Sequence, residues 1–139
     1  MPIHFTSLEF KQRQDVASAA ISSKGLDAIL LFAPESHYWL TGYDTFGFSL
    51  FQTMVLTCKG DIHLLTRAPD LRQALYTSTL SEDHIHIWDE VEGANPAKDL
   101  AKLLSELGLT KGKIGYESQT VGLTDFNGRL LRDAIPNLQ

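Results

Sequence analysis

Apolar residues in this chain fall into short runs that are separated by polar turns and by amphipathic stretches. Residues 27–32 are almost uniformly apolar, which is typical of a central strand covered on both faces. Residues 49–58 are rich in apolar and β-branched side chains and predict a long strand; residues 62–66 would pair back on it after a Lys-Gly-Asp turn. Within the first strand, Ile29 and Leu31 are the expected core positions.

Four other stretches carry apolar residues at helical spacing. Thr6 and Glu9 form a capping box at the start of the first, and Gly25 follows its end. Asn95 and Pro96 open another as N-cap and first helical residue. The predicted helices cover residues 6–24, 68–80, 95–107 and 124–134. Shorter apolar segments at 84–88 and 113–117 predict two further strands.

This alternation of helices and strands, with a hairpin near its start, predicts an α/β fold with a mixed β-sheet flanked by helices. The 139 residues are enough for one domain with a substantial core, residues 1–139. Residues 135–139 resemble the approach to one more strand, so we expect the chain to be a fragment of a longer protein.

Charge and composition exclude several classes of partner. The formal net charge is −5, and six acids stand against Lys98 in residues 82–99, a distribution that would repel nucleic acid. No apolar run approaches the roughly 20 residues that cross a bilayer, so no membrane partner is expected. With Cys58 as the lone cysteine and no signal-peptide pattern, we expect a cytoplasmic protein.

Histidines are the main candidates for metal ligands. His84 and His86 share one face of a predicted strand, as in some zinc sites. No third ligand follows at a diagnostic spacing, and the alternation with Ile85 and Ile87 favours the polar face of an amphipathic strand. We therefore expect no metal and no catalytic residue in this chain, and a solvated His63 in the hairpin strand.

Aromatic residues are densest in the stretch that follows the first predicted strand. Gly42 and Gly47 interrupt this stretch. Aromatic side chains on a glycine-flanked loop are typical of an interface or a pocket lip. Core packing alone and core packing combined with an external contact both remain open for Tyr38, Trp39, Tyr43, Phe46, Phe48 and Phe51.

Three segments together carry a resemblance to a known family. They are Gly-Leu-Asp-Ala at 25–28, Ser-His-Tyr-Trp-Leu-Thr-Gly-Tyr-Asp at 36–44 and Lys-Ile-Gly-Tyr-Glu at 113–117. Because the three segments follow one another in this order and with these gaps, the chain resembles the N-terminal domain of creatinases, prolidases and aminopeptidases P. The resemblance implies an RNase-H-like α/β domain that precedes a "pita-bread" catalytic domain.

In that family the catalytic domain holds two divalent metal ions (Mn, Co or Zn) through two Asp, one His and two Glu, and none of these has a counterpart here. The resemblance thus implies no cofactor in this domain and a parent enzyme that is Xaa-Pro dipeptidase-like. Family N-terminal domains mediate dimer contacts and lend the loop after Thr-Gly to the neighbouring subunit's active site. Transferred to this sequence, that pocket role in trans falls on Tyr43, Asp44, Phe46 and Phe48.

One departure from the family pattern bears on the substrate. Creatinases carry an arginine that binds substrate carboxylate shortly after an aromatic residue of that loop. Counting without gaps places Phe48 at the aromatic position and Leu50 at the arginine position. Leucine cannot make a bidentate carboxylate contact, so creatine is disfavoured and the Xaa-Pro peptidase branch is expected.

The expected partners are the chain's own C-terminal catalytic domain, a second copy in a homodimer, and a small peptide or small amide substrate. An ectoine-hydrolase-like amide hydrolase is one alternative. A free-standing interaction module without catalysis is another, and five metal ligands in a downstream sequence would distinguish it from an enzyme.

Overall fold

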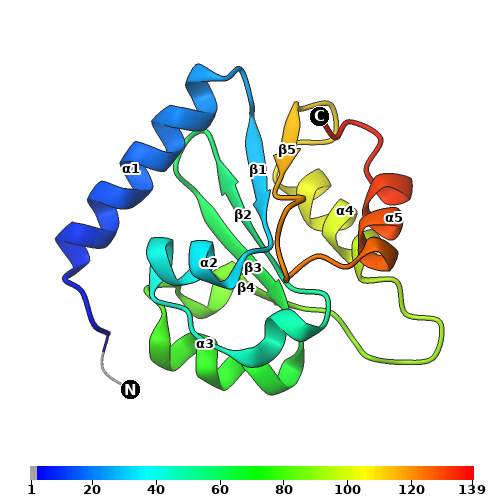
Figure 1. Ribbon diagram of the computed structural model, residues 1–139, viewed down its shortest axis with the longest axis horizontal. Helices are drawn as coiled ribbons and strands as arrows, with labels where there is room; N and C mark the ends of the chain where they lie inside the picture. Colours follow the sequence, from blue (N-terminus) through cyan, green and yellow to red (C-terminus); the bar gives the residue numbers. More distant parts are fainter. Residues whose placement is uncertain (1–2) are drawn as a thin grey trace.

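A computed structural model describes residues 3–139 and places them around one five-stranded sheet (Figure 1). Its strands are β1 (Ala28–Leu31), β2 (Thr53–Thr57), β3 (Ile62–Thr66), β4 (Ile85–Ile87) and β5 (Ile114–Tyr116). Their order across the sheet is β4-β3-β2-β1-β5. β2 is antiparallel to both of its neighbours, whereas β1 pairs in parallel with β5 and β3 with β4. The predicted mixed sheet is confirmed.

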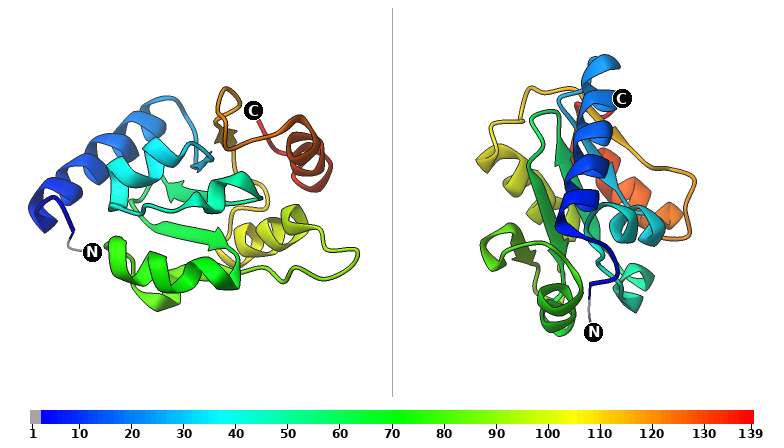
Figure 2. Two further views of the ribbon diagram at one scale, coloured as in Figure 1. Left: turned by 60° about the horizontal axis from the view of Figure 1, so that its bottom comes forward. Right: turned by 90° about the vertical axis from the view of Figure 1, so that its left-hand side faces the viewer.

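Helices cover both faces of the sheet. The α-helices in the described residues are α1 (Ser7–Ser23), α2 (Pro34–Thr41), α3 (Leu71–Thr77), α4 (Pro96–Glu106) and α5 (Asp125–Ala134). Three short 3-10 turns join them: η1 (Phe46–Ser49), η2 (Ala68–Asp70) and η3 (Glu82–His84). Figure 1 shows α1 and α2 on one side of β1 and α4 and α5 on the other, and the left view of Figure 2 shows the same separation.

Each face of the sheet carries its own hydrophobic core. Leu30 and Val55 belong to the core beneath α4 and α5. Leu31, Met54 and Leu56 belong to the core beneath α1, α2 and α3. Because neighbouring strand residues point to opposite faces, and both faces are covered, β1 and β2 lack polar alternation in the sequence.

The strand predicted over residues 49–58 begins later than expected. Residues 46–49 form the 3-10 turn η1, and only Thr53–Thr57 pairs in the sheet. Two hydroxyls hold the turn: Thr45 Oγ1 accepts from the Gly47 amide, and the Ser49 hydroxyl donates to the Phe46 carbonyl. Local side-chain partners thus satisfy backbone groups that a strand would have paired.

Two expectations for residues 27–32 need correction. β1 has a neighbour on each side, but β2 is the middle strand of the sheet. Leu30 and Leu31 are buried as core residues, whereas Ile29 is only half-buried. Ile29 lines an open apolar groove between α1 and α2, which leaves its side chain partly uncovered.

The helix predicted over residues 68–80 is shorter in the structure. It consists of η2 followed by α3, which ends at Thr77. The hydroxyls of Thr77 and Ser78 donate to the carbonyls of Gln73 and Ala74 one turn earlier. Hydroxyl groups that bond back to the helix backbone compete with its continuation.

Four of the strands, β1, β3, β4 and β5, run in the same direction. Their carboxyl ends therefore meet at one edge, here called the carboxyl edge. The connections that leave these strands and the segment that enters β2 lie at this edge. In open α/β sheets, loops at the carboxyl ends of the strands are the usual place for ligand contacts.

Candidate functional site

The turn from β1 into α2 is held by the carboxylate of the residue that directly follows β5. Glu117 Oε1 accepts hydrogen bonds from the backbone N–H groups of Phe32 (2.9 Å) and Ala33 (3.0 Å). Its other oxygen, Oε2, accepts from the hydroxyl of Ser36 at 2.8 Å. Glu117 belongs to the Lys-Ile-Gly-Tyr-Glu segment and Ser36 to the aromatic segment, so one side chain links two of the three segments that carry the family resemblance.

The exit from α2 requires glycine. Gly42 ends the helix in the left-handed region, at φ +83°. A Cβ at this position would lie 2.7 Å from the carbonyl oxygen of Thr77 and 3.2 Å from the ring of Phe10. The backbone therefore passes α3 closely enough to exclude any side chain, and this fixes where the following loop begins.

Residues 43–48, the aromatic loop, start with a side chain that is not at the surface. Tyr43 is only 1% exposed, so its ring is buried in the core of this domain and is not part of an exposed pocket lip. Its hydroxyl donates to Gln52 Oε1 at 2.7 Å, and its ring stacks on His37 with centroids 6.1 Å apart. Burial raises the pKa of Tyr43 above its ordinary value. Tyr43 therefore supports the loop from below.

The other predicted loop residues reach the surface to different degrees. Phe46 is 87% exposed, so its ring stands at the surface of the domain. Asp44 is also exposed, whereas Phe48 is half-buried. The Phe46 and Phe48 rings lie 6.3 Å apart at a tilt of 36°. Leu50, at the position of the creatinase arginine, is exposed as well.

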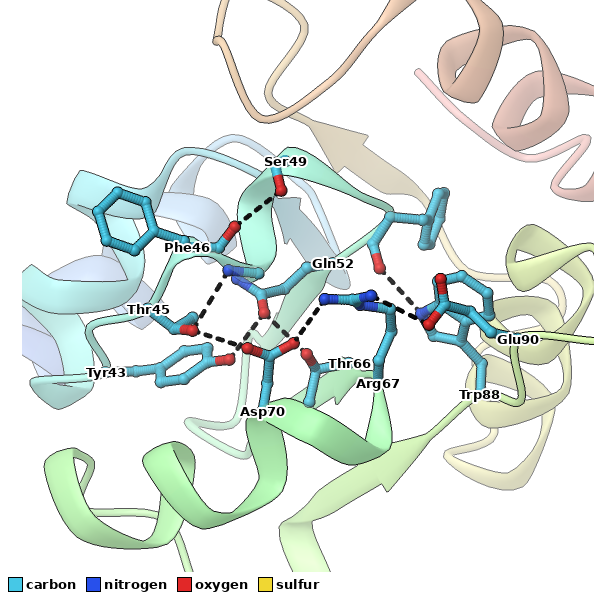
Figure 3. A network of polar contacts seen from close by, with 12 residues as sticks. Tyr43, Thr45, Phe46, Ser49, Gln52, Thr66, Arg67, Asp70, Trp88 and Glu90 are labelled. Carbon is cyan, nitrogen blue, oxygen red and sulfur yellow. Dashed lines mark hydrogen bonds and ion pairs between the residues drawn. The ribbon is translucent and has the colours of Figure 1, made fainter.

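A network of buried polar side chains lies directly under the loop (Figure 3). Gln52 Oε1 accepts from the hydroxyls of both Tyr43 (2.7 Å) and Thr66 (2.8 Å). Asp70, only 9% exposed, accepts from the Thr45 hydroxyl at 2.8 Å through Oδ1. The loop is thus tied at two places, to Gln52 directly before β2 and to Asp70 at the end of η2.

An arginine joins this network to a neighbouring loop. Arg67 Nη2 lies 3.4 Å from Asp70 Oδ2, and Nη1 lies 3.0 Å from Glu90 Oε2. Glu90 stands in the connection between β4 and α4, so Arg67 links two loops of the carboxyl edge (Figure 3). The buried Nε of Arg67 lacks a hydrogen-bond partner among residues 3–139.

Sequence reasoning did not identify Gln52, Arg67 or Asp70 as part of this site. Asp70 is separated from Thr45 by 25 residues, and Gln52 from Thr66 by 14. No local spacing rule connects such pairs. The available signal was Arg67, a polar residue directly after the predicted strand 62–66, whereas Gln52 fell inside the predicted strand 49–58 and precedes β2 only in the structure.

Histidines gather at the other end of β3 and β4. His63, expected to be solvated, is in fact buried at 9% exposure, because the rings of His84 and His86 cover it at centroid distances of 4.4 and 5.2 Å. Burial lowers the pKa of both His63 and His86. Within residues 3–139, no group of three or more His, Cys, Asp or Glu side chains is placed to hold a metal ion.

None of the helices in residues 3–139 has the length and hydrophobicity that a membrane span requires. The aromatic loop presents exposed residues at the surface, Asp44 and Phe46 among them.

Comparison with known proteins gives consistent matches. The model of the Creatinase/Prolidase N-terminal domain family matches residues 13–138. An uncharacterized hydrolase/peptidase, y4tM, of Sinorhizobium fredii is 22% identical over 141 residues, which cover 98% of this chain and 36% of that protein. The ectoine hydrolase of Halomonas elongata is 29% identical over 118 residues, which cover 81% of this chain and 30% of that protein. The chain thus spans about a third of the length of these relatives.

Among solved structures, an Xaa-Pro aminopeptidase from Streptococcus pyogenes superposes with a TM-score of 0.70 at 21% identity. The match covers 96% of this chain and 91% of that one. At 21% identity, this structural similarity establishes the fold alone.

Proposed function

Because the chain belongs to the creatinase/prolidase N-terminal domain family, we propose that it is the non-catalytic N-terminal domain of a dinuclear-metal hydrolase of the Xaa-Pro peptidase type. In this role it aids dimerisation and shapes the substrate pocket of the neighbouring subunit. The observation that carries the proposal is Phe46, a ring 87% exposed on a loop that buried polar groups fix from below. An exposed aromatic ring on a fixed loop is suited to contact with a partner surface.

The catalytic groups would lie in a C-terminal domain of the parent protein, which is expected to hold two divalent ions such as Mn, Co or Zn. The chemistry that such a pair supplies is activation of water and polarisation of the scissile carbonyl. Residues 3–139 offer no ligand set of their own. We place the protein in the cytoplasm, which is consistent with a single cysteine.

The residues of this chain would act on the substrate's surroundings. Phe46 and Phe48, with rings 6.3 Å apart, would cover the pocket and exclude water. Asp44 would stand beside them at the pocket rim, and Tyr43 would hold the loop in place. Leu50 supplies no charge for a substrate carboxylate, which favours an Xaa-Pro peptide over creatine.

An amide hydrolase related to ectoine hydrolase is the second candidate, and the 29% identity to the Halomonas elongata enzyme favours it. A domain that retains the fold without catalysis is the third. A substrate panel on the parent protein, containing Xaa-Pro dipeptides, ectoine and creatine, separates the first two. No turnover of any of these, with metals supplied, would favour the third.

The test of the pocket role in trans is subunit mixing. The parent protein carrying Phe48→Ala is mixed with a variant inactivated in its catalytic domain, and hybrid dimers are allowed to form. Each hybrid then contains one intact loop opposite one intact catalytic centre, so activity should reappear. If it does not, the loop serves its own subunit or no active site at all.

A further inference from the structure

The aspartate at the start of α3 does not perform the usual task of its position. Asp70 is the N-cap residue of α3, where an aspartate side chain ordinarily accepts from the first amides of its helix. In the described part of the chain its carboxylate makes no such capping bond. It accepts instead from the Thr45 hydroxyl and pairs with Arg67.

The loop backbone is shaped to fit this carboxylate. A Cβ built on Gly47 would lie 2.9 Å from Cγ and Oδ2 of Asp70 and 2.5 Å from Oε1 of Gln52. The turn therefore lies directly against the two acceptor groups, with no room for a side chain between them. Thr45 completes the contact: its Oγ1 donates to Asp70 and accepts from the Gly47 amide.

These contacts restrict the freedom of an exposed ring. The Gly47 amide and the Leu50 amide, which donates to the Gly47 carbonyl, close the turn that carries Phe46. A loop that is ordered before it meets its partner loses less conformational entropy on binding. The partly buried ion pair with Arg67 also holds the carboxylate, which accepts in addition from the Thr45 hydroxyl.

We propose that Asp70 is the positioning residue of the aromatic loop: its buried carboxylate fixes the turn at Thr45 and Gly47 so that Phe46 stands outward at the carboxyl edge of the sheet. The anchoring itself is a property of this chain alone. Its consequence for catalysis rests on the proposed function, so the two are tested separately.

Amide hydrogen exchange on the chain tests the anchoring. Asp70→Ala removes both contacts, and Thr45→Val removes the hydroxyl at nearly constant volume. Both should speed exchange at the Gly47 and Leu50 amides by about tenfold or more, the scale of a lost hydrogen bond to a charged group. Amides of β2 and β3 should change by less than about twofold. Two control variants should show the amide exchange rates of the unaltered chain. Thr45→Ser keeps the hydroxyl, and Asp89→Asn removes an exposed acid at the same edge of the sheet.

Two results would overturn the anchoring role. Loop amides that exchange at the original rate in both Asp70→Ala and Thr45→Val would show that the contacts do not hold the turn. Equal acceleration in the loop and in β2 and β3 would show that Asp70 supports the whole core instead. If Asp70→Ala does not fold, Thr45→Val decides by the same two criteria at the Leu50 amide, because the Gly47 amide loses its own acceptor in this variant.

Steady-state kinetics of the parent protein on an Xaa-Pro dipeptide test the consequence. Asp70→Ala, which removes the acceptor of the Thr45 hydroxyl, should lower kcat/KM by about tenfold. The share of this loss that falls on kcat and the share that falls on KM should match those of Phe46→Ala. Asp89→Asn should leave both parameters unchanged. If Phe46→Ala lowers kcat/KM and a folded Asp70→Ala does not, the positioning role is wrong. If Phe46→Ala has no effect while the loop amides respond as expected, the anchoring stands and the proposed pocket function fails.

Discussion

Nδ1 of His63 lies 3.0 Å from Nε2 of His86, so two imidazoles on neighbouring parallel strands approach within hydrogen-bond distance. One ring can donate to the other only while at least one of the two nitrogens is unprotonated. The ring of His84 lies 4.4 Å from that of His63 on the same side. Protonation of all three rings would place positive charges in contact beside β4, the outermost strand of the sheet.

Stability should fall as the pH is lowered through the range below about 6.5, the ordinary histidine value. Burial lowers the folded-state pKa of His37, His63 and His86, so the folded chain binds fewer protons than the unfolded chain in this range. Folding is therefore favoured fully above the unfolded pKa and progressively less below it. Thermal melts between pH 7.5 and 5.5 measure the effect, and His63→Gln should flatten the profile. A melting temperature that is constant over this range would contradict the prediction.

Truncation of either leucine of β1 should lower the stability of the fold. Leu30→Ala and Leu31→Ala remove buried side chains from opposite cores and should each lower the free energy of unfolding by about 2–5 kcal/mol. Leu8→Ala, at a position 68% exposed on α1, should change it by less than about 0.5 kcal/mol. Reversible urea unfolding gives all three values. A loss below about 0.5 kcal/mol for Leu31→Ala would place β1 outside the core.

Gly42→Ala should destabilise the fold more than the same change at Gly25. Both glycines have positive φ, +83° and +73°, and a left-handed alanine costs about 1–2 kcal/mol. At Gly25 a new Cβ would have nothing within 4 Å, whereas at Gly42 it would meet the Thr77 carbonyl at 2.7 Å. The difference between the two free energies of unfolding isolates this contact. Equal losses of unfolding free energy at the two glycines would mean that the end of α3 moves away from the new Cβ without a measurable loss of stability.

Phe46→Ala should separate stability from activity. The ring is 87% exposed, so the free energy of unfolding should change by less than about 0.5 kcal/mol. In the parent protein, kcat/KM for its substrate should fall by about one to two orders of magnitude, the scale of a lost positioning contact. Phe126, also exposed but on α5, provides the matched control, and Phe126→Ala should leave kcat/KM unchanged. Equal kcat/KM values for Phe46→Ala and Phe126→Ala would show that the loop is not part of the substrate pocket.

The chain on its own should show no peptidase activity and hold no stoichiometric metal. Within residues 3–139, no three His, Cys, Asp or Glu side chains are placed to hold an ion, and structural and catalytic zinc sites use at least three protein ligands. Elemental analysis of chelator-washed protein, with an Xaa-Pro dipeptide assay alongside it, checks both statements. One tightly held Mn, Co or Zn per chain would contradict the first.

The order of helices and strands could be predicted from the sequence because each element has a local signature. The Thr6 capping box, the Asn95-Pro96 helix start and the apolar runs of β1 and β2 act over a few residues. The resemblance to a family then predicted that the loop after Gly42 is the candidate site. Both kinds of signal lie within single segments of the chain.

Burial within the aromatic loop could not be predicted, because it depends on residues distant in the sequence. Tyr43 is buried since Gln52 and His37 meet it, and η1 replaces the start of a strand since Thr45 reaches Asp70. His63 is covered by rings from β4. Alternation rules show which side of a strand a residue occupies, but not what the neighbouring element brings to that side.

The bond between Glu117 and Ser36 bears on how relatives of this chain can diverge. One carboxylate satisfies two backbone amides and a hydroxyl in a segment more than eighty residues away. A substitution that removes both acceptor oxygens of Glu117 would leave all three donors without this partner, so a stable relative would need a compensating change in the turn before α2. We therefore expect the two positions to covary, and a family member that lacks the acid should also differ at the start of its aromatic segment.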